Sequence, residues 1–100
     1  MNEQATETAY AAIEADLAAR FTLDQRAEKA AYSARRAAAL FTKADTANDA
    51  GDDTEARELA GQAAKWARTG RGYTFGGTDY QAEQFRSVIG TRLWSYAGLS

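Results

Sequence analysis

Small apolar residues recur every seven positions between residues 23 and 48. Two interleaved series make up this repeat: Ala27, Ala34 and Phe41, and Ala30, Ala37 and Ala44. A seven-residue repeat places its members on one side of an α-helix and is typical of helices that pack along their length. Because most members are alanines, a second helix can approach this side closely. The repeat therefore predicts a long helix in an antiparallel pair with a neighbouring helix.

The composition favours helices throughout the chain. Of the 45 hydrophobic residues, 24 are Ala, which has the highest intrinsic helix propensity. Apolar β-branched residues, which favour strands, are nearly absent. Only 21 larger hydrophobic side chains remain to fill a core. We therefore expect residues 1–100 to form a single helical domain with a thin core.

Two sequence signals define the first helix and the start of the second. The apolar spacing from Tyr10 to Leu17 predicts a first helix over residues 5–20. Thr22, with Gln25 three residues later, has the form of a capping box, which marks a helix N-terminus. The pattern leaves open whether the first helix ends at Thr22 or only bends there.

The third helix is expected to complete the antiparallel pair. Asp52 with Glu55 again resembles a capping box, and an apolar face follows it up to Ala67. Gly70 stands where a helix C-cap is expected. These signals predict a long alanine-seamed helical hairpin over residues 23–69.

Residues 70–77 contain four glycines and are predicted to be a loop, because glycine weakens a helix. Thr78 or Asp79 then caps a last helix, whose apolar face includes Phe85 and is interrupted by Gly90. The competing interpretation is a short β-hairpin that pairs residues 73–75 with residues 92–96. We favour helix, since Phe85, Ile89 and Leu93 are four apart and no two-residue turn signal separates the two candidate strands. The predicted fold is all-α, a small three- or four-helix bundle built around the hairpin.

A local pattern of small residues in the hairpin resembles that of a tetratricopeptide-type helical hairpin. It comprises Leu40, Ala44, Ala47, Gly51, Ala56, Ala60 and Ala63. The resemblance covers about a third of the chain and has no second copy, and Lys43 occupies a usually apolar position. It implies a helix–turn–helix and neither a peptide groove nor a partner.

The absence of Cys and His excludes most familiar active sites. No thiol nucleophile, sulfur-ligated zinc or imidazole base is available. Gly72 and Gly77 have the spacing of a phosphate-binding loop, but no Lys lies between them. An EF-hand loop aligned on Gly51 lacks its first ligand and its final Glu. We therefore expect no enzymatic activity, no metal and no cofactor.

No apolar run is long enough to cross a bilayer, and the first ten residues lack the basic start and the apolar core of a signal peptide. These observations predict a cytoplasmic protein without a membrane partner. The net charge of −2 is unevenly distributed, since residues 1–59 carry −5 and residues 60–100 carry +3. Any anion-binding role is therefore expected in the second part of the chain or on one helix face.

Long cations and aromatic residues in this second part are the candidate partner-binding residues. They are Arg68, Arg71, Tyr73, Phe75, Arg86, Arg92 and Trp94. Trp94 falls off the predicted core face of the last helix, so we expect it to be exposed or covered by a partner. The structural alternative is that Tyr73 and Phe75 close the thin core at one end.

A second candidate site is the basic stripe, which we define as Lys29, Arg36 and Lys43. Residues seven apart lie on one side of a helix, where they could follow a nucleic-acid backbone. The structural alternative is a solvated face that is paired with acids of the first helix, for instance Glu14 and Asp16.

The sequence thus predicts a non-catalytic module that occupies a surface of another protein or protein complex. Its size and chemistry are typical of an inhibitor or accessory protein from a phage or mobile element, including the anti-defence type. A homodimer is a further expected form, because alanine-rich faces bury little area. The alternative is a small nucleic-acid-binding or regulatory module that uses the basic stripe and the Arg/aromatic glycine loop.

Overall fold

The computed structural model describes residues 3–74 and 77–99, with all side chains in these ranges except those of residues 3–8 and 10. The described ranges form five helices, which are α1 Glu3–Arg20, α2 Leu23–Asp49, α3 Asp53–Tyr73, α4 Asp79–Ile89 and α5 Thr91–Tyr96. The all-α prediction is confirmed, and these ranges contain no strand. The β-hairpin alternative is wrong for residues 92–96, which are helical, and it also drew on residue 75, which lies outside the described residues.

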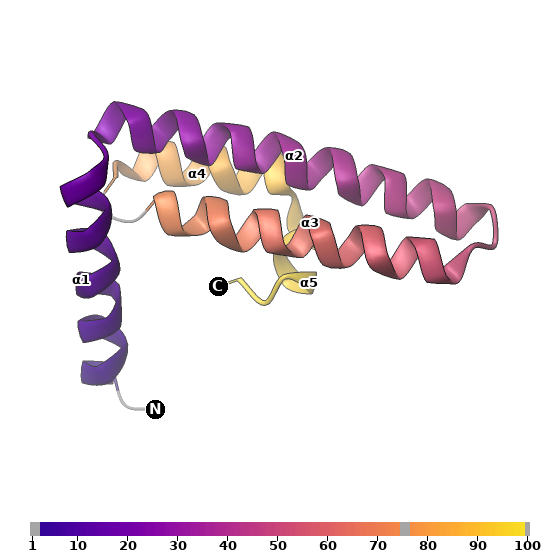
Figure 1. The fold of residues 1–100 in the computed structure, drawn as a ribbon, viewed down its shortest axis with the longest axis horizontal. Helices are drawn as coiled ribbons and strands as arrows, with labels where there is room; N and C mark the ends of the chain where they lie inside the picture. The colour runs from indigo at the N-terminus through magenta and orange to yellow at the C-terminus, as the bar shows by residue number, and fades with distance from the viewer. Residues whose placement is uncertain (1–2, 75–76, 100) are drawn as a thin grey trace.

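α2 and α3 lie side by side as a long antiparallel hairpin, as Figure 1 shows. α4 runs along the same end of this hairpin from which α1 departs, and α5 crosses α3 near the middle of the molecule (Figure 1). α1 projects steeply away from the other helices. The helices α2 to α5 therefore form a small bundle, and α1 extends from one corner of it.

Side-chain caps set the helix starts that the sequence predicted. The Thr22 hydroxyl accepts a hydrogen bond from the Gln25 backbone N–H at 3.1 Å, and the Gln25 side chain accepts one from the Thr22 N–H at 2.9 Å. This capping box ends α1 and starts α2, so the chain turns at this point and does not merely bend. Thr78 and Gln81 form the same reciprocal pair at the start of α4.

The last predicted helix is divided in two at Gly90. This residue has a φ of +80°, a conformation that L side chains rarely adopt, and it is both the C-cap of α4 and the N-cap of α5. The expected total of three or four helices was therefore too low. The break starts a separate helix, yet Leu93, the last member of the predicted apolar spacing, is buried in the core together with Phe85 and Ile89.

The predicted glycine loop is wrong for residues 70–73, which complete the last turn of α3. Gly70 is buried inside the helix and is not its C-cap, and that position belongs to Thr74. A Cβ atom built on Gly70 would lie 2.5 Å from Phe85 Cε2 and 2.9 Å from Ser33 Cβ. Glycine is thus required here for the close approach of α4, and the packing that it permits offsets its low helix propensity.

The core combines small side chains from the hairpin with a few large ones from α4 and α5. The buried cluster comprises Ala30, Ala34, Ala37, Leu40, Ala63, Ala64, Ala67, Phe85, Ile89, Leu93, Trp94 and Ala97. Every hairpin member except Leu40 is an alanine, whereas the C-terminal helices supply the aromatic and large aliphatic groups. The stability of the bundle therefore depends strongly on those few large side chains.

Candidate functional site

Three of the predicted partner-binding residues meet where α3, α4 and α5 join. The guanidinium carbon of Arg86 lies 4.9 Å from the centre of the Trp94 ring, and that of Arg71 lies 5.8 Å from it. Both distances are within the range of a cation–π contact. Arg71 comes from the last turn of α3 and Arg86 from the last turn of α4. The fold therefore gathers two cations from separate helices around one indole.

Trp94 is not the exposed residue that the sequence predicted. Only 8% of its surface is accessible, and its ring packs edge-on against Phe85 with the two ring centres 6.2 Å apart. The physical reason is the break at Gly90, which turns the Trp94 side of α5 toward the core. Trp94 therefore belongs to the buried core, and its ring also lies beside the two arginines.

An open hollow lies beside this cluster. It has a volume of about 470 Å³, and it is lined by Arg71, Ala82, Glu83, Arg86, Ser87 and Trp94. We call it the Arg–Trp hollow. Its wall holds two guanidinium groups and one carboxylate, so positive charge dominates it. Guanidinium groups can bind a carboxylate through two parallel hydrogen bonds, which makes an acidic group the natural ligand.

Hydrogen bonds to the protein orient two arginines near the hollow. Arg71 donates to the Thr74 hydroxyl at 2.8 Å, and this hydroxyl donates to the Arg71 carbonyl at 2.7 Å. Arg68 donates to the Ala97 carbonyl at 3.3 Å and so connects α3 to the turn after α5. Arg68 therefore contributes to the tertiary structure and does not line the hollow.

Of the two predicted aromatic residues of the glycine segment, only Tyr73 is described by the structure, and it does not join this site. Tyr73 is half-buried in the last turn of α3, where it packs edge-on against Phe21 with ring centres 5.9 Å apart. It also packs against the buried cluster, which agrees with the structural alternative for this residue. Phe75 lies outside the described residues.

Arg92 lies on α5 and faces α2, away from the other arginines. Its two terminal nitrogens donate to the two carboxylate oxygens of Asp45, at 2.9 and 3.2 Å, and its guanidinium lies 5.1 Å from the Phe41 ring centre. This ion pair connects Arg92 of α5 to Asp45 of α2. The residue is thus paired within the chain, and a partner would have to compete with Asp45 for it.

The Arg92 contact produces a testable titration behaviour. The hydrogen bonds from Arg92 are the largest effect on the Asp45 carboxyl and hold its pKa below the ordinary value; desolvation opposes this lowering, and the positive charge of Arg92 adds to it. The ion pair therefore stabilises the fold above the pKa of an unfolded Asp, and this contribution is lost as the pH falls through the lowered pKa.

We expect Arg92→Ala to raise the pKa of Asp45 toward about 3.9. A carbon-detected NMR titration of the Asp45 carboxyl would measure it. Arg20→Ala, which removes a different ion pair, should leave this pKa unchanged.

The basic stripe is only partly a free cationic face. Lys29 Nζ lies 4.7 Å from the Phe21 ring centre, and Arg36 lies 5.6 Å from that of Trp66. Lys43 is exposed. Aromatic side chains, rather than the acids of α1, therefore accompany the first two members of the stripe, and Asp16 instead pairs with Arg20 at 3.4 Å.

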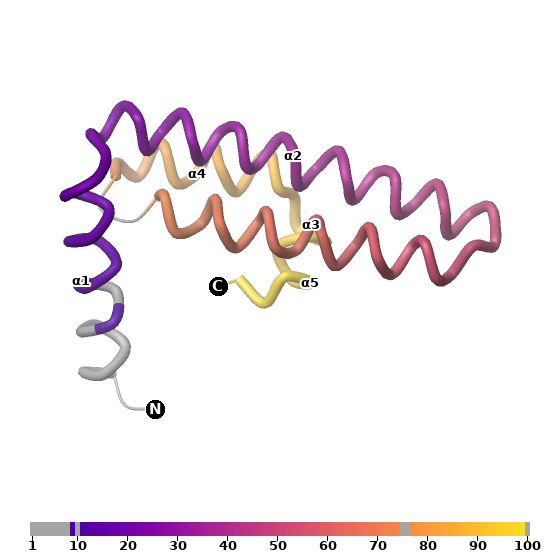
Figure 2. Tube along the Cα trace, in the orientation of Figure 1, coloured from indigo at the N-terminus to yellow at the C-terminus, as the bar shows by residue number. Residues whose placement is uncertain are grey.

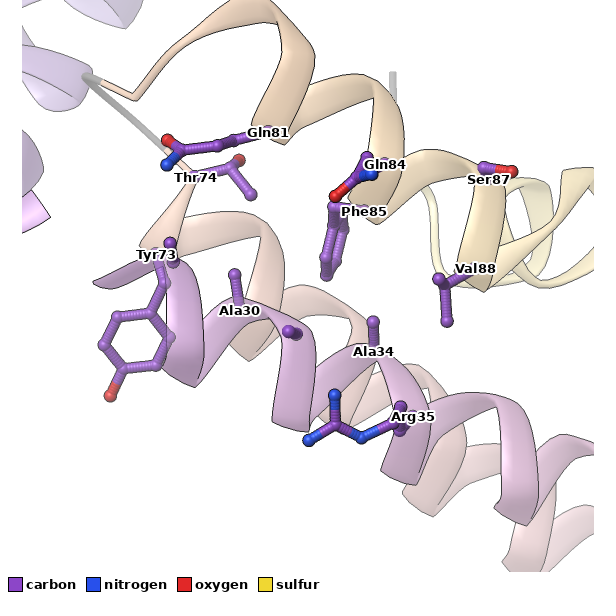
Figure 3. A pocket seen from close by; sticks show the side chains of 12 residues that line it. Ala30, Ala34, Arg35, Tyr73, Thr74, Gln81, Gln84, Phe85, Ser87 and Val88 are labelled. Carbon is purple, nitrogen blue, oxygen red and sulfur yellow. The ribbon is translucent and has the colours of Figure 1, made fainter. Parts of the chain in front are cut away.

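Sequence reasoning missed an apolar groove between α2 and α4, which Figure 3 shows from close by. This α2–α4 groove has a volume of about 410 Å³, and it is lined by Ala27, Ala30, Ala31, Ala34, Arg35, Tyr73, Thr74, Gln81, Gln84, Phe85, Ser87 and Val88. The sequence positions that indicate this groove are Ala27 and Ala34 on α2 and Val88 on α4. Their meaning depends on how the two helices are placed, which spacing within one helix does not give.

Within the part of the chain that the structure describes, no group of three acidic side chains could hold a metal ion. In the same residues, none of the helices has the length and apolar character needed to cross a membrane. No protein-family model, no curated protein and no solved structure matches the chain.

Proposed function

We propose that this chain is a non-catalytic protein-binding module and that the Arg–Trp hollow is the centre of its interface. One observation carries the proposal. Two arginines from different helices lie against a single buried indole, next to an open hollow of about 470 Å³. Arginine and tryptophan dominate interface energetics, and the hollow offers a partner side chain a recessed place to bind.

The chemistry of the hollow favours an acidic side chain of the partner. Contact with Trp94 limits the rotamers of Arg71 and Arg86, so that less conformational entropy is lost when a carboxylate binds. Glu83 adds one negative charge to the wall. A single carboxylate with neighbouring hydrogen-bond donors fits such a wall better than the closely spaced charges of a nucleic-acid backbone.

A rigid support would strengthen this interface. Ala34, Ala37, Ala63 and Ala67 are fully buried between the long helices. We infer from this that the alanine seam lets α2 and α3 pack closely, which holds Arg71 at a fixed position in the last turn of α3. Preorganisation of this kind lowers the cost of binding. A small module that occupies a partner surface is suited to the inhibitor or accessory role expected for a phage or mobile-element protein.

Nucleic-acid binding is the second candidate function, and one observation favours it. Lys29, Tyr32 and Trp66 line a shallow hollow between α2 and α3, and about half of the Tyr32 surface is exposed. Cations beside an exposed aromatic ring can bind single-stranded nucleic acid by stacking. The net charge of −2 and the presence of Glu28 in this hollow act against it.

The proposal is tested by comparing affinity capture from native lysate by the wild type and by Arg71→Ala/Arg86→Ala. Arg20→Ala/Arg57→Ala removes two exposed cations elsewhere and is the matched control. A captured protein should bind the wild type and the control with equal affinity. Its affinity for the double variant should be lower by a factor of about 30 or more. Far-UV circular dichroism checks that each variant is folded. Unchanged affinity of the double variant for every captured protein would show that the hollow is not the interface.

The nucleic-acid candidate has its own measurement. Binding of the wild type to generic DNA and RNA is measured at two salt concentrations, together with Lys29→Ala/Arg36→Ala. Tight binding that weakens steeply with salt and is lost in this variant would favour the second candidate function over the first.

A further inference from the structure

α1 is a helix whose described surface is largely without tertiary contacts. Of its residues 11–20, all are exposed except Leu17, which is half-buried, and Ile13 exposes 40% of its surface. Figure 2 shows the helix extending away from the bundle. Isolated helices of this length are only marginally stable in water, because most helical stability comes from packing of an apolar face. The open stripe of Ile13 and Leu17 therefore calls for a surface to cover it.

The α2–α4 groove is a second uncovered apolar surface on the same chain. Ala30, Ala34 and Phe85 form its buried floor, and Val88 at its side exposes 47% of its surface. The side chains labelled in Figure 3 show this apolar floor between polar groups, with Arg35 on α2 and Gln84 on α4. An apolar floor with polar edges is suited to an amphipathic helix.

The geometry of the chain separates these two surfaces within one molecule. The Thr22 capping box fixes the corner between α1 and α2, and α1 points away from α4 (Figure 1). We propose that two copies of this chain form a dimer in which α1 of each copy lies in the α2–α4 groove of the other. One two-fold arrangement then covers both apolar surfaces of both copies.

Charge decides between this arrangement and direct packing of α1 against α1. Residues 3–20 carry four acids and one base, a net charge of −3, whereas residues 21–100 carry eleven bases and ten acids, a net charge of +1. Two copies of α1 packed together would repel each other, whereas α1 against the bundle is attractive. At about 100° per residue, Glu14 and Asp16 flank the stripe of Ile13 and Leu17 on opposite sides, and Arg35 at the groove offers a cation to either.

The proposal can be tested separately from the proposed function, because none of the arginines around Trp94 lines the α2–α4 groove, although Ser87 lines both that groove and the Arg–Trp hollow. The first test is the mass in solution, measured by light scattering coupled to size exclusion. The wild type should have twice the 10.8 kDa mass of one chain. Ala31→Glu in the groove and Ile13→Glu on α1 should each shift the mass to that of one chain.

Exposed alanines on the same helices provide matched controls. Ala39→Glu on α2 lies outside the groove, and Ala15→Glu lies on the opposite side of α1 from the stripe. Both variants should remain dimeric. A monomeric wild type, or equal loss of the dimer in the test and control variants, would overturn the proposal. Circular dichroism of each variant shows whether the bundle is retained.

Disulfide formation tests the register, because the natural chain contains no Cys. The single variants Ile13→Cys and Ala31→Cys are oxidised separately and as an equimolar mixture, and cross-linked peptides are identified by mass spectrometry. We expect the mixed disulfide between the two variants to form at least tenfold faster than either symmetric one. Dominance of the symmetric disulfide at position 13 would show that α1 packs against α1 and would overturn the proposal.

Discussion

Phe85→Ala should lower the free energy of unfolding by about 3–5 kcal/mol, the usual cost of deleting a buried phenyl ring. Only 4% of the Phe85 surface is accessible, and the ring lies between Gly70 of α3, Ser33 of α2 and Trp94 of α5. Apart from Leu40, the hairpin contributes only alanines to the buried cluster, so little side-chain volume there can fill the resulting cavity.

Urea denaturation followed by circular dichroism measures this loss. Tyr80→Ala is the control, because Tyr80 lies on the same helix, is 70% exposed and lines neither the Arg–Trp hollow nor the α2–α4 groove; this variant should cost less than about 1 kcal/mol. A similar small loss for both variants would mean that α4 is not packed on the hairpin as the structure shows.

Gly70→Ala should destabilise the protein by about 1–3 kcal/mol, although alanine is the better helix former. The new methyl group would lie 2.5 Å from Phe85 Cε2 and 2.9 Å from Ser33 Cβ, so α4 would have to move. Gly61→Ala is the matched control in the same helix, since a Cβ atom added there would meet nothing within 4 Å. That variant should gain about 0.5–1 kcal/mol from the higher helix propensity of alanine.

A double-mutant cycle identifies the cause of the loss at Gly70. In the Phe85→Ala background the ring that the new methyl group meets most closely is gone and only the contact with Ser33 Cβ remains, so Gly70→Ala should cost clearly less there. If the cost is the same in both backgrounds, the contact between α3 and α4 at this point is not its cause.

Local signals in the sequence predicted most of the fold. The pair Thr22 with Gln25 gave the start of α2, because a capping box is formed by residues only three apart, and Thr78 was one of the two candidate caps for the last helix. The end of α3 could not be predicted in this way. Glycine at position 70 is explained by Phe85, which is fifteen residues away in the sequence, and by Ser33 on another helix.

The candidate site was predicted in part for the same reason. Arg71, Arg86 and Trp94 were grouped by residue type, and the structure brings these three together. Arg92 was assigned to the same set but lies against Asp45 of α2. The positive φ of Gly90 separates the directions of α4 and α5, so helical spacing could not be carried across it to predict where Arg92 and Trp94 point.

An NMR titration tests whether the Arg–Trp hollow binds an acidic group of a protein. The chain has two tryptophans, so the two indole N–H signals report separately on the hollow at Trp94 and on the basic stripe beside Trp66. Trp66→Phe assigns the signals. The probes are a capped peptide that carries a single Glu and a single-stranded oligothymidine.

We expect the peptide to shift the Trp94 indole and Arg86 guanidinium signals of the wild type in a saturable way, and we expect the Trp94 shift to be absent in Arg71→Ala/Arg86→Ala. The Trp66 signal should stay in place, and the oligothymidine should have the weaker effect on Trp94. Two results would contradict the proposed interface. The first is that only the Trp66 and Lys29 signals shift, and the second is that the oligothymidine shifts the Trp94 signal whereas the peptide does not.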